Sequence, residues 1–176
     1  MSSWVPALVA FVSYDLDERS RQYFPRVFAY IYGRTRDIQA SEDLVLEVFE
    51  RAPAKDRALR GEGAFAIWLF ATARGLLISH RRRQDLSGSP PCQGAPEPEL
   101  LQRPEVARIM NHLCRFPLRE QDVTALKFDA QLTDAQIAQV MKLPQGAVRT
   151  ILHRALRKLR KALEQESHSS SIAGSA

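Results

Sequence analysis

The sequence predicts an all-α protein built from two small helical domains. Apolar residues recur at a period of 3.6 in both halves of the chain, and the alternation that marks strands is missing. Between the halves lies a stretch rich in proline and glycine, with too few apolar residues to form a core. From these observations we expect an N-terminal extension over residues 1–15, a helical domain over 16–85, a linker over 86–104, a second helical domain over 105–165 and a disordered tail over 166–176.

The first domain is expected to contain about three helices. Their apolar faces include Phe24 to Ile31, Leu44 to Phe49 and Phe65 to Leu76. Ser41, followed by two acids, predicts an N-cap for the second helix. Pro53 and the Gly61-Glu62-Gly63 stretch predict the break before the third.

The second domain is expected to end in a helix-turn-helix. Helical spacing resumes at Val106 and pauses at Phe116-Pro117, and Thr133 is placed to cap a further helix. The segment Leu143-Pro144-Gln145-Gly146 then interrupts the pattern. A last helix follows, with a single apolar stripe formed by Val148, Leu152, Leu156, Leu159 and Leu163.

Composition limits the function classes. The net charge of +5 favours anionic partners such as nucleic acid. The apolar stretches at Val5 to Val12 and Ile67 to Ile78 are too short, or too interrupted by Arg74, to span a bilayer, so we expect no membrane insertion. The N-terminal stretch does not resemble a secretion signal, and either packing on the first domain or binding a partner would explain its apolar residues. Cys92 and Cys114 form no CxxC pair, which favours reduced thiols and a cytoplasmic location.

The last helix carries the strongest functional signal. Its outer face collects cations, with no acidic residue between Gln145 and Lys161. Such a helix can enter the major groove of DNA, and each phosphate it neutralises releases counterions. Arg149 and Thr150 are the candidate base readers, and Arg154 and Arg157 suit the backbone. A solvated basic face, or one that binds an acidic protein groove, is the alternative. The candidate DNA-binding residues are Gln145, Arg149, Thr150, His153, Arg154 and Arg157.

Two further patterns lie in the first domain. Residues 37–50 form an acidic helix, which would repel phosphates and is therefore expected to face a protein. The alternative is that its first acids serve only the helix dipole. Residues 64–83 begin with aromatic side chains and end with cations, as a platform for single-stranded nucleic acid requires. Core packing is the alternative for Phe65 and Trp68.

Together these segments resemble the extracytoplasmic-function sigma factors of the sigma-70 family, which keep only conserved regions two and four. The resemblance rests on Ala40-Ser41-Glu42-Asp43-Leu44 with Glu47-Val48-Phe49, on Trp68-Leu69-Phe70 with Ala73-Arg74, on Phe116 to Gln121, and on Gly146 to Thr150 with Leu152 to Ala155. The order and spacing of these patterns around a linker are more specific than any one of them.

The resemblance implies core RNA polymerase and promoter DNA as partners, and it admits an anti-sigma factor. The acidic helix would dock on the clamp helices of the beta-prime subunit through Glu42, Asp43, Leu46, Glu47 and Phe49. One base of the opened minus-ten element would be flipped into a pocket formed by the helix from Phe65 to Arg83 and the preceding loop, roughly Pro53 to Gly63. The minus-ten DNA-binding residues would be Trp68, Phe70, Ala73, Arg74, Arg81 and Arg82. The second domain would read the minus-thirty-five element as duplex and contact the beta flap.

Three positions depart from the family pattern. Gly75 stands where an asparagine that contacts the flipped base is common, and Ile151 stands where arginine is frequent. Leu46 replaces a frequent glutamine on the polymerase-facing helix. Together these departures argue against predicting the promoter sequence by analogy with familiar members.

Other functions are less well supported. A helix-turn-helix repressor would fit the second domain alone, but it would not explain the acidic and the aromatic-basic helices of the first. The histidines are scattered and no phosphate-binding glycine loop is present, so we expect no catalytic site and no cofactor. His112 and Cys114 are too few for a metal site.

Overall fold

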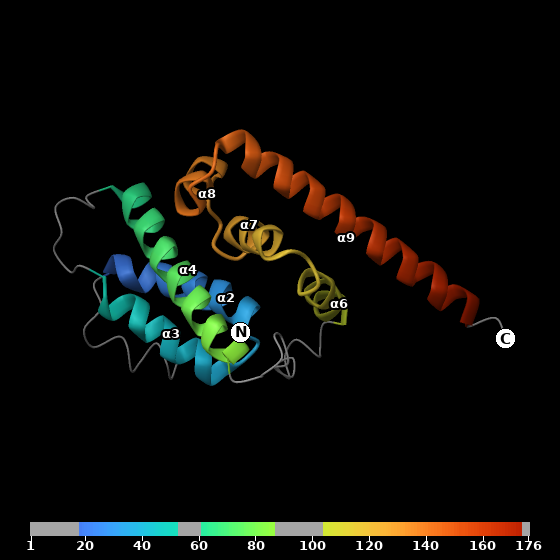
Figure 1. Ribbon diagram of the computed structural model, residues 1–176, viewed down its shortest axis with the longest axis horizontal. Coiled ribbons are helices and arrows are strands. Elements are labelled where there is room, and N and C mark those ends of the chain that lie inside the picture. Colours follow the sequence, from blue (N-terminus) through green and yellow to red (C-terminus); the bar gives the residue numbers. More distant parts are fainter. Residues whose placement is uncertain (1–17, 53–60, 87–103, 174–176) are drawn as a thin grey trace.

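The computed structural model describes residues 18–52, 61–86 and 104–173, and all regular structure in these ranges is helical (Figure 1). This confirms the all-α prediction. The first group of helices contains α2 (Glu18–Thr35), α3 (Ile38–Glu50) and α4 (Glu62–Leu86). The second contains α6 (Pro104–Leu113), α7 (Leu118–Phe128), α8 (Asp134–Met141) and α9 (Gln145–Ala173). The apolar N-terminal stretch, Pro53, Cys92 and most of the predicted linker lie outside the described residues.

Aromatic side chains dominate the core of the first group. The rings of Phe24 and Phe49 are stacked with centroids 5.6 Å apart, which joins α2 to α3. Tyr30 meets Phe70 edge-on at 5.7 Å and joins α2 to α4. Phe65 is only 2% exposed, so this aromatic residue belongs to the core.

The cap of α3 differs from the sequence-based prediction. Asp37, not Ser41, is the N-cap residue, and its carboxylate accepts a hydrogen bond of 3.1 Å from the backbone N–H of Ala40. Ser41 lies inside the helix and is fully buried, with its hydroxyl 2.7 Å from that of Thr35. Asp37 and Ser41 are both residue types that can cap a helix. Asp37 is the cap here because the chain turns sharply after α2, where Arg36 has a φ of 56°.

The helix-turn-helix forms as predicted. Thr133 caps α8 in a reciprocal capping box with Gln136. The helix ends at Lys142, which adopts the left-handed conformation with a φ of 53°, and α9 begins three residues later at Gln145. Val148 and Leu152 on the inner face of α9 are buried against the rest of the group.

The end of the chain is more helical than predicted. Helix α9 continues to Ala173, so residues 166–173 are helical where we expected disorder. The sequence has no proline or glycine between Ala147 and Ala173, so nothing in it forces the helix to end. Glu166 is also held by α6, through an ion pair of 3.0 Å with Arg108.

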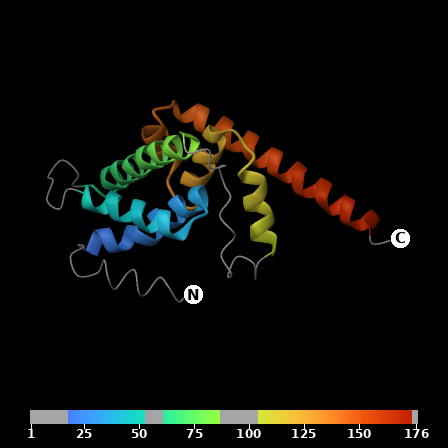
Figure 2. The same ribbon diagram turned by 60° about the horizontal axis from the view of Figure 1, so that its bottom comes forward.

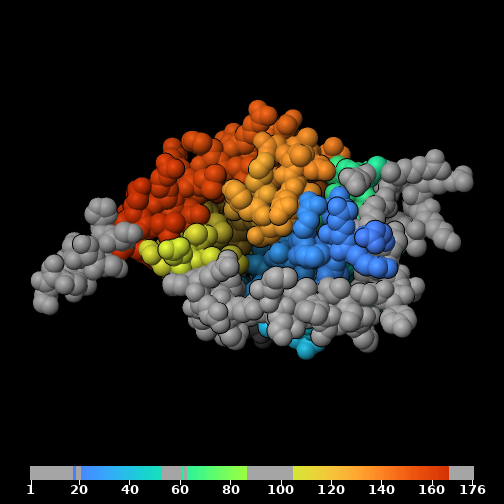
Figure 3. Space-filling view, turned by 180° about the vertical axis from the view of Figure 1, so that it is seen from behind, coloured from blue at the N-terminus to red at the C-terminus, as the bar shows by residue number. Residues whose placement is uncertain are grey.

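The two groups of helices pack against each other. Helix α8 lies between α4 and α9 and contacts both, as Figures 1 and 2 show. Buried residues of both groups form one continuous hydrophobic core. From behind, the first group (blue) and the second group (yellow to red) meet side by side (Figure 3). The domain boundaries drawn from the sequence stay a prediction.

The apolar composition of helix α4 bears on whether this helix could cross a membrane. By length and composition alone, its segment Gly63–Leu86 is long and apolar enough to cross a membrane. Its largest apolar side chains, however, form core contacts: Phe65, Leu69 and Phe70 are at most 2% exposed. These core positions account for part of the hydropathy of α4.

Candidate nucleic-acid interface

The second helix of the helix-turn-helix presents the predicted DNA-binding residues to solvent. All six candidates are exposed on α9: Gln145, Arg149, Thr150, His153, Arg154 and Arg157. The opposite side of the same helix is anchored by Val148, Leu152 and Ala155, each at most 8% exposed. The helix therefore separates an apolar anchor from a basic outer surface, as the sequence indicated.

Arg149 is held at the start of this surface by a carboxylate on α8. Its Nε lies 3.4 Å from Oδ2 of Asp134, while the side chain remains 69% exposed. Lys127 donates a 2.7 Å hydrogen bond to Oδ1 of the same aspartate. The hydrogen bond from Lys127, followed by the weaker influence of Arg149, lowers the pKa of Asp134 below its ordinary value. Asp134 therefore stays ionised and can orient Arg149 without covering it.

Lys158 does not belong to the free basic surface. Its Nζ lies 2.8 Å from both carboxylate oxygens of Glu120 on α7, a residue that is 6% exposed. The local sequence around Lys158 does not indicate this pairing, because Glu120 is 38 positions away and its approach depends on tertiary packing.

The candidate minus-ten residues of α4 divide into three sets. Phe70 and Ala73 are completely buried, so in this structure they build the core and not a nucleic-acid surface. Trp68 is half-buried against the core, and Arg74 and Arg81 are also half-buried. Arg82 is exposed. A pattern of consecutive aromatic and small residues cannot show which of them face inward, and the tertiary contacts decide it.

The exposed side of α4 borders an open groove against α3. Polar and basic side chains line it, together with the backbone at Gly75, and the lining residues are Glu47, Arg51, Thr72, Gly75, Leu76, Ser79, Arg82 and Arg83. No atom lies within 4 Å of the position that a Cβ on Gly75 would take. Packing therefore does not require glycine there. Sequence reasoning missed Thr72, Ser79 and Arg83, although their spacing along the helix places them on the same face as Gly75 and Arg82.

The acidic face of α3 is open to solvent in part. Asp43 is exposed, whereas Glu42, Leu46 and Glu47 are half-buried, and Glu47 pairs with Arg51 one turn later. Phe49 is 6% exposed and stacks on Phe24, so it supports the helix from inside and does not present a docking surface in this structure.

A buried ion-pair cluster joins the two groups of helices. Asp122 of α7 is 7% exposed and pairs with Arg34 of α2 and with Arg74 of α4, whose Nε lies 3.1 Å from Oδ2. Arg26 of α2 adds a 2.9 Å hydrogen bond from its Nε to the backbone oxygen of Ala130. The predicted minus-ten residue Arg74 is therefore engaged by the second group of helices.

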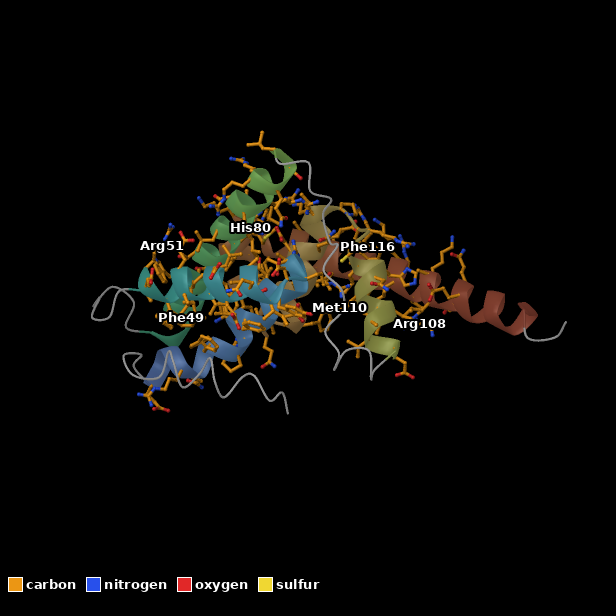
Figure 4. All side chains as sticks on the ribbon, turned by 90° about the horizontal axis from the view of Figure 1, so that it is seen from below. Phe49, Arg51, His80, Arg108, Met110 and Phe116 are labelled. Atoms are coloured by element: carbon orange, nitrogen blue, oxygen red, sulfur yellow. The ribbon has the colours of Figure 1, made fainter. Side chains whose placement is uncertain are left out.

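An apolar pocket of about 370 Å³ lies between α2, α6, α7 and α9. Its lining includes Met110 and Leu113 from α6 and Leu159 from α9. In Figure 4, Met110 lies on the side of α6 that faces α2, and Arg108 lies toward α9. The one carboxylate in the lining belongs to Asp129, and burial raises its pKa to about 6, against a lowering influence from Arg34.

Within the described ranges, no group of three or more histidine, cysteine or acidic side chains is arranged to hold a metal ion. His112 instead contacts a carboxylate, with its Nε2 2.9 Å from Oε1 of Glu166. The described polar clusters join helices to one another.

Comparison with known proteins agrees with this architecture. The family profile of Sigma-70 region 2 matches residues 20–86, and that of Sigma-70, region 4 matches residues 115–161. Together the two profiles cover more than half of the chain.

Curated relatives and a solved structure are similar along most of the chain. The ECF RNA polymerase sigma factor BldN of Streptomyces coelicolor is 28% identical over 155 residues, which are 82% of this chain and 59% of BldN. The RNA polymerase sigma factor YlaC of Bacillus subtilis is 24% identical, over 84% of this chain and 91% of YlaC. The sigma factor RpoE of Bartonella quintana, solved in complex with the anti-sigma factor NepR, shares the fold with a TM-score of 0.60 and 16% identity, over 81% of this chain and 92% of RpoE.

With regions two and four in the same order, on a helical framework that includes the basic helix-turn-helix, this chain belongs to the sigma-70 family and, within it, to the extracytoplasmic-function sigma factors.

Proposed function

We propose that this chain binds core RNA polymerase in the cytoplasm and directs promoter-specific initiation of transcription. The observation that carries the proposal is the basic outer face of α9, on which all six candidate DNA-binding residues are exposed, in a chain with both sigma regions. In this role α9 enters the major groove of the minus-thirty-five element, Arg149 and Thr150 contact bases, and Arg154 and Arg157 contact phosphates.

For the minus-ten element we propose the open groove between α3 and α4. Its exposed members Arg82 and Arg83 would hold the backbone of the opened strand, and Thr72 and Ser79 would contact bases by hydrogen bonds. Gly75 offers no side chain to a flipped base, so the base preference would differ from that of members with asparagine there. Trp68, Phe70 and Ala73 would act by positioning α4.

Two further surfaces suit the polymerase. The acidic face of α3, centred on the exposed Asp43, would dock on the beta-prime clamp helices. The apolar pocket lined by α6, α7 and α9 would take the beta flap, since an apolar groove between helices accepts an amphipathic partner segment. RpoE of Bartonella quintana binds an anti-sigma factor, and a partner of that kind would also suit this chain.

The proposal is tested by transcription in vitro with purified core polymerase and a genomic DNA library. We expect initiation at a small set of promoters only when the chain is present, and the aligned start sites would give the consensus. The rival function of an autonomous repressor predicts a different result: tight binding of duplex operators by the isolated chain. Such binding, together with no stimulation of the polymerase, would overturn the proposal.

A charge reversal tests the docking surface. Asp43→Lys should reduce co-purification with core polymerase at least several-fold, because an exposed cation would replace an anion at a charged interface. The matched control is Glu105→Lys, which reverses an exposed acid on α6. Circular dichroism checks that both variants fold. Unchanged co-purification of the Asp43 variant would show that α3 is not the docking helix.

A further inference from the structure

A small basic cleft lies where α2, α4 and α7 meet. Its lining includes Arg34 from α2 and Arg74, His80 and Arg81 from α4. The cavity that remains has a volume of about 60 Å³, which is room for roughly two water molecules. The single acid in this lining is Asp122, which belongs to the other group of helices.

The cleft has more hydrogen-bond donors than Asp122 satisfies. Asp122 pairs with Arg34 and Arg74 through one oxygen each. Nη1 of Arg34 is buried and has no hydrogen-bond partner among the described residues. A buried guanidinium nitrogen without an acceptor is unfavourable, and an anion with more acceptor oxygens than one carboxylate supplies would satisfy it.

A phosphodiester meets this requirement. Arginine binds carboxylate and phosphate with the same planar arrangement of N–H donors, and phosphate oxygens accept hydrogen bonds in several directions. Arg74 lies on the helix proposed to handle the minus-ten element, and Arg34 faces it across the cleft. When Asp122 leaves, these two arginines are exposed on the side of α4 that faces α7, which is a different side from the groove against α3.

Promoter binding requires Asp122 to leave. Helix α8 packs on both α4 and α9, and packed helices have axes about 8–10 Å apart, so α4 and α9 approach to within about 20 Å of each other at α8. Elements centred about 25 base pairs apart are separated by about 85 Å of duplex. The two groups of helices must therefore separate to read both elements. Residues 87–103 can span up to about 60 Å when extended, which allows the two groups to move apart.

We propose that Arg34 and Arg74 form a binding site for a backbone phosphate of nucleic acid, and that Asp122 occupies this site in place of the phosphate while the protein is closed. The proposal rests on the proposed function and adds a residue, Arg34, that no sequence pattern assigned to DNA. Closure and nucleic-acid binding then compete for the same two guanidinium groups.

Binding of a fluorescein-labelled oligothymidylate of twelve nucleotides by the isolated full chain tests the competition. Asp122→Asn should tighten binding about three- to ten-fold at 50 mM salt and make it more dependent on salt, because at least one more phosphate is neutralised. Adding Arg34→Gln to this variant should remove the gain. The matched control, Glu105→Gln, also removes one negative charge from the second group but lies on an exposed part of α6, and it should change affinity less than two-fold.

Small-angle scattering and circular dichroism complete the test. Asp122→Asn should increase the radius of gyration while the helical signal is retained. An unchanged affinity and radius for this folded variant would overturn the proposal, and so would a gain in affinity that survives Arg34→Gln. Transcription by the wild-type chain is measured separately. A chain that fails to support transcription, yet shows the Asp122 and Arg34 effects, would contradict the proposed function and leave the phosphate site standing.

Discussion

Asp129 is an acidic residue in an apolar pocket, and its pKa is raised to about 6 by burial. The folded protein therefore holds this proton at a higher pH than the unfolded chain does, and ionisation of Asp129 destabilises the fold as pH rises from about 4 through 6. Asp129→Asn should raise the free energy of unfolding by about 1–3 kcal/mol at pH 7.5. Urea titrations at several pH values measure this.

The same substitution should have little effect near pH 3.5, where Asp129 is protonated in the folded state and mostly protonated in the unfolded state. Asp85→Asn is the control, since Asp85 is exposed at the end of α4. A gain in stability that is equal at both pH values would mean that shape or hydrogen bonding, and not the charge of Asp129, sets the effect.

Arg149 combines exposure with a fixed orientation. Asp134 holds its Nε at 3.4 Å, so the guanidinium is positioned before DNA arrives. Arg149→Ala should weaken minus-thirty-five recognition by about 1–3 kcal/mol, the cost of losing a good base contact. Transcription from promoters with intact and mutated minus-thirty-five elements measures this.

Arg149→Ala should also lower the ratio of transcription from the promoter with the intact minus-thirty-five element to transcription from the promoter with the mutated element. The exposed Arg160, which lies farther along α9, provides the control. Its replacement by alanine should lower transcription from both promoters by the same factor. Discrimination that is equal before and after Arg149→Ala would remove this residue from the base readers.

At the scale of single elements, the capping box of α8 fixes the first helix of the helix-turn-helix. Thr133 accepts from the backbone of Gln136 at 3.3 Å, and its own N–H donates to Oε1 of Gln136 at 2.9 Å. Thr133→Ala should cost about 1 kcal/mol of stability, because it removes the acceptor of a helix N-terminal N–H. Thermal unfolding followed by circular dichroism measures it, with Thr150→Ala on the exposed face of α9 as control. Equal midpoint temperatures of unfolding for the Thr133→Ala and Thr150→Ala variants would contradict a capping role for Thr133.

The comparison of Thr133 with Ser41 shows what sequence could predict about the elements. At Thr133 the cap, the apolar period and the following turn agree, and the helix begins where they indicate. Near α3 two cap residues compete within four positions, and local pattern does not choose between them. The outer face of α9 was predictable because its period sorts cations from apolar residues. On α4, consecutive aromatic and small residues hide which side is buried, and the pattern alone does not show that Phe70 and Ala73 lie in the core.

At the scale of the whole molecule, the seam between the two groups of helices could not be predicted. Arg34 and Asp122 are 88 positions apart, and neither lies in a pattern that points to the other. Such a contact depends on the packing of α2, α4, α7 and α8 together. The sequence accordingly predicted two tethered domains, and the structure adds a continuous hydrophobic core that crosses from one group to the other.

A shared core predicts cooperative unfolding of the two groups. The wild-type chain should lose both in one transition, because separating them exposes apolar surface at the α4 and α8 contact and leaves the Asp122 cluster without partners. The two tryptophans, Trp4 and Trp68, precede the second group, so their fluorescence reports on the first part of the chain, whereas circular dichroism reports on all helices. In a urea titration the two signals should coincide for the wild type. The fluorescence and circular dichroism signals should diverge for Asp122→Asn, because its two groups of helices are no longer joined by the ion pairs of Asp122. Two separate transitions in the wild type would instead mean that the seam contributes little to stability, and that the groups already separate without nucleic acid.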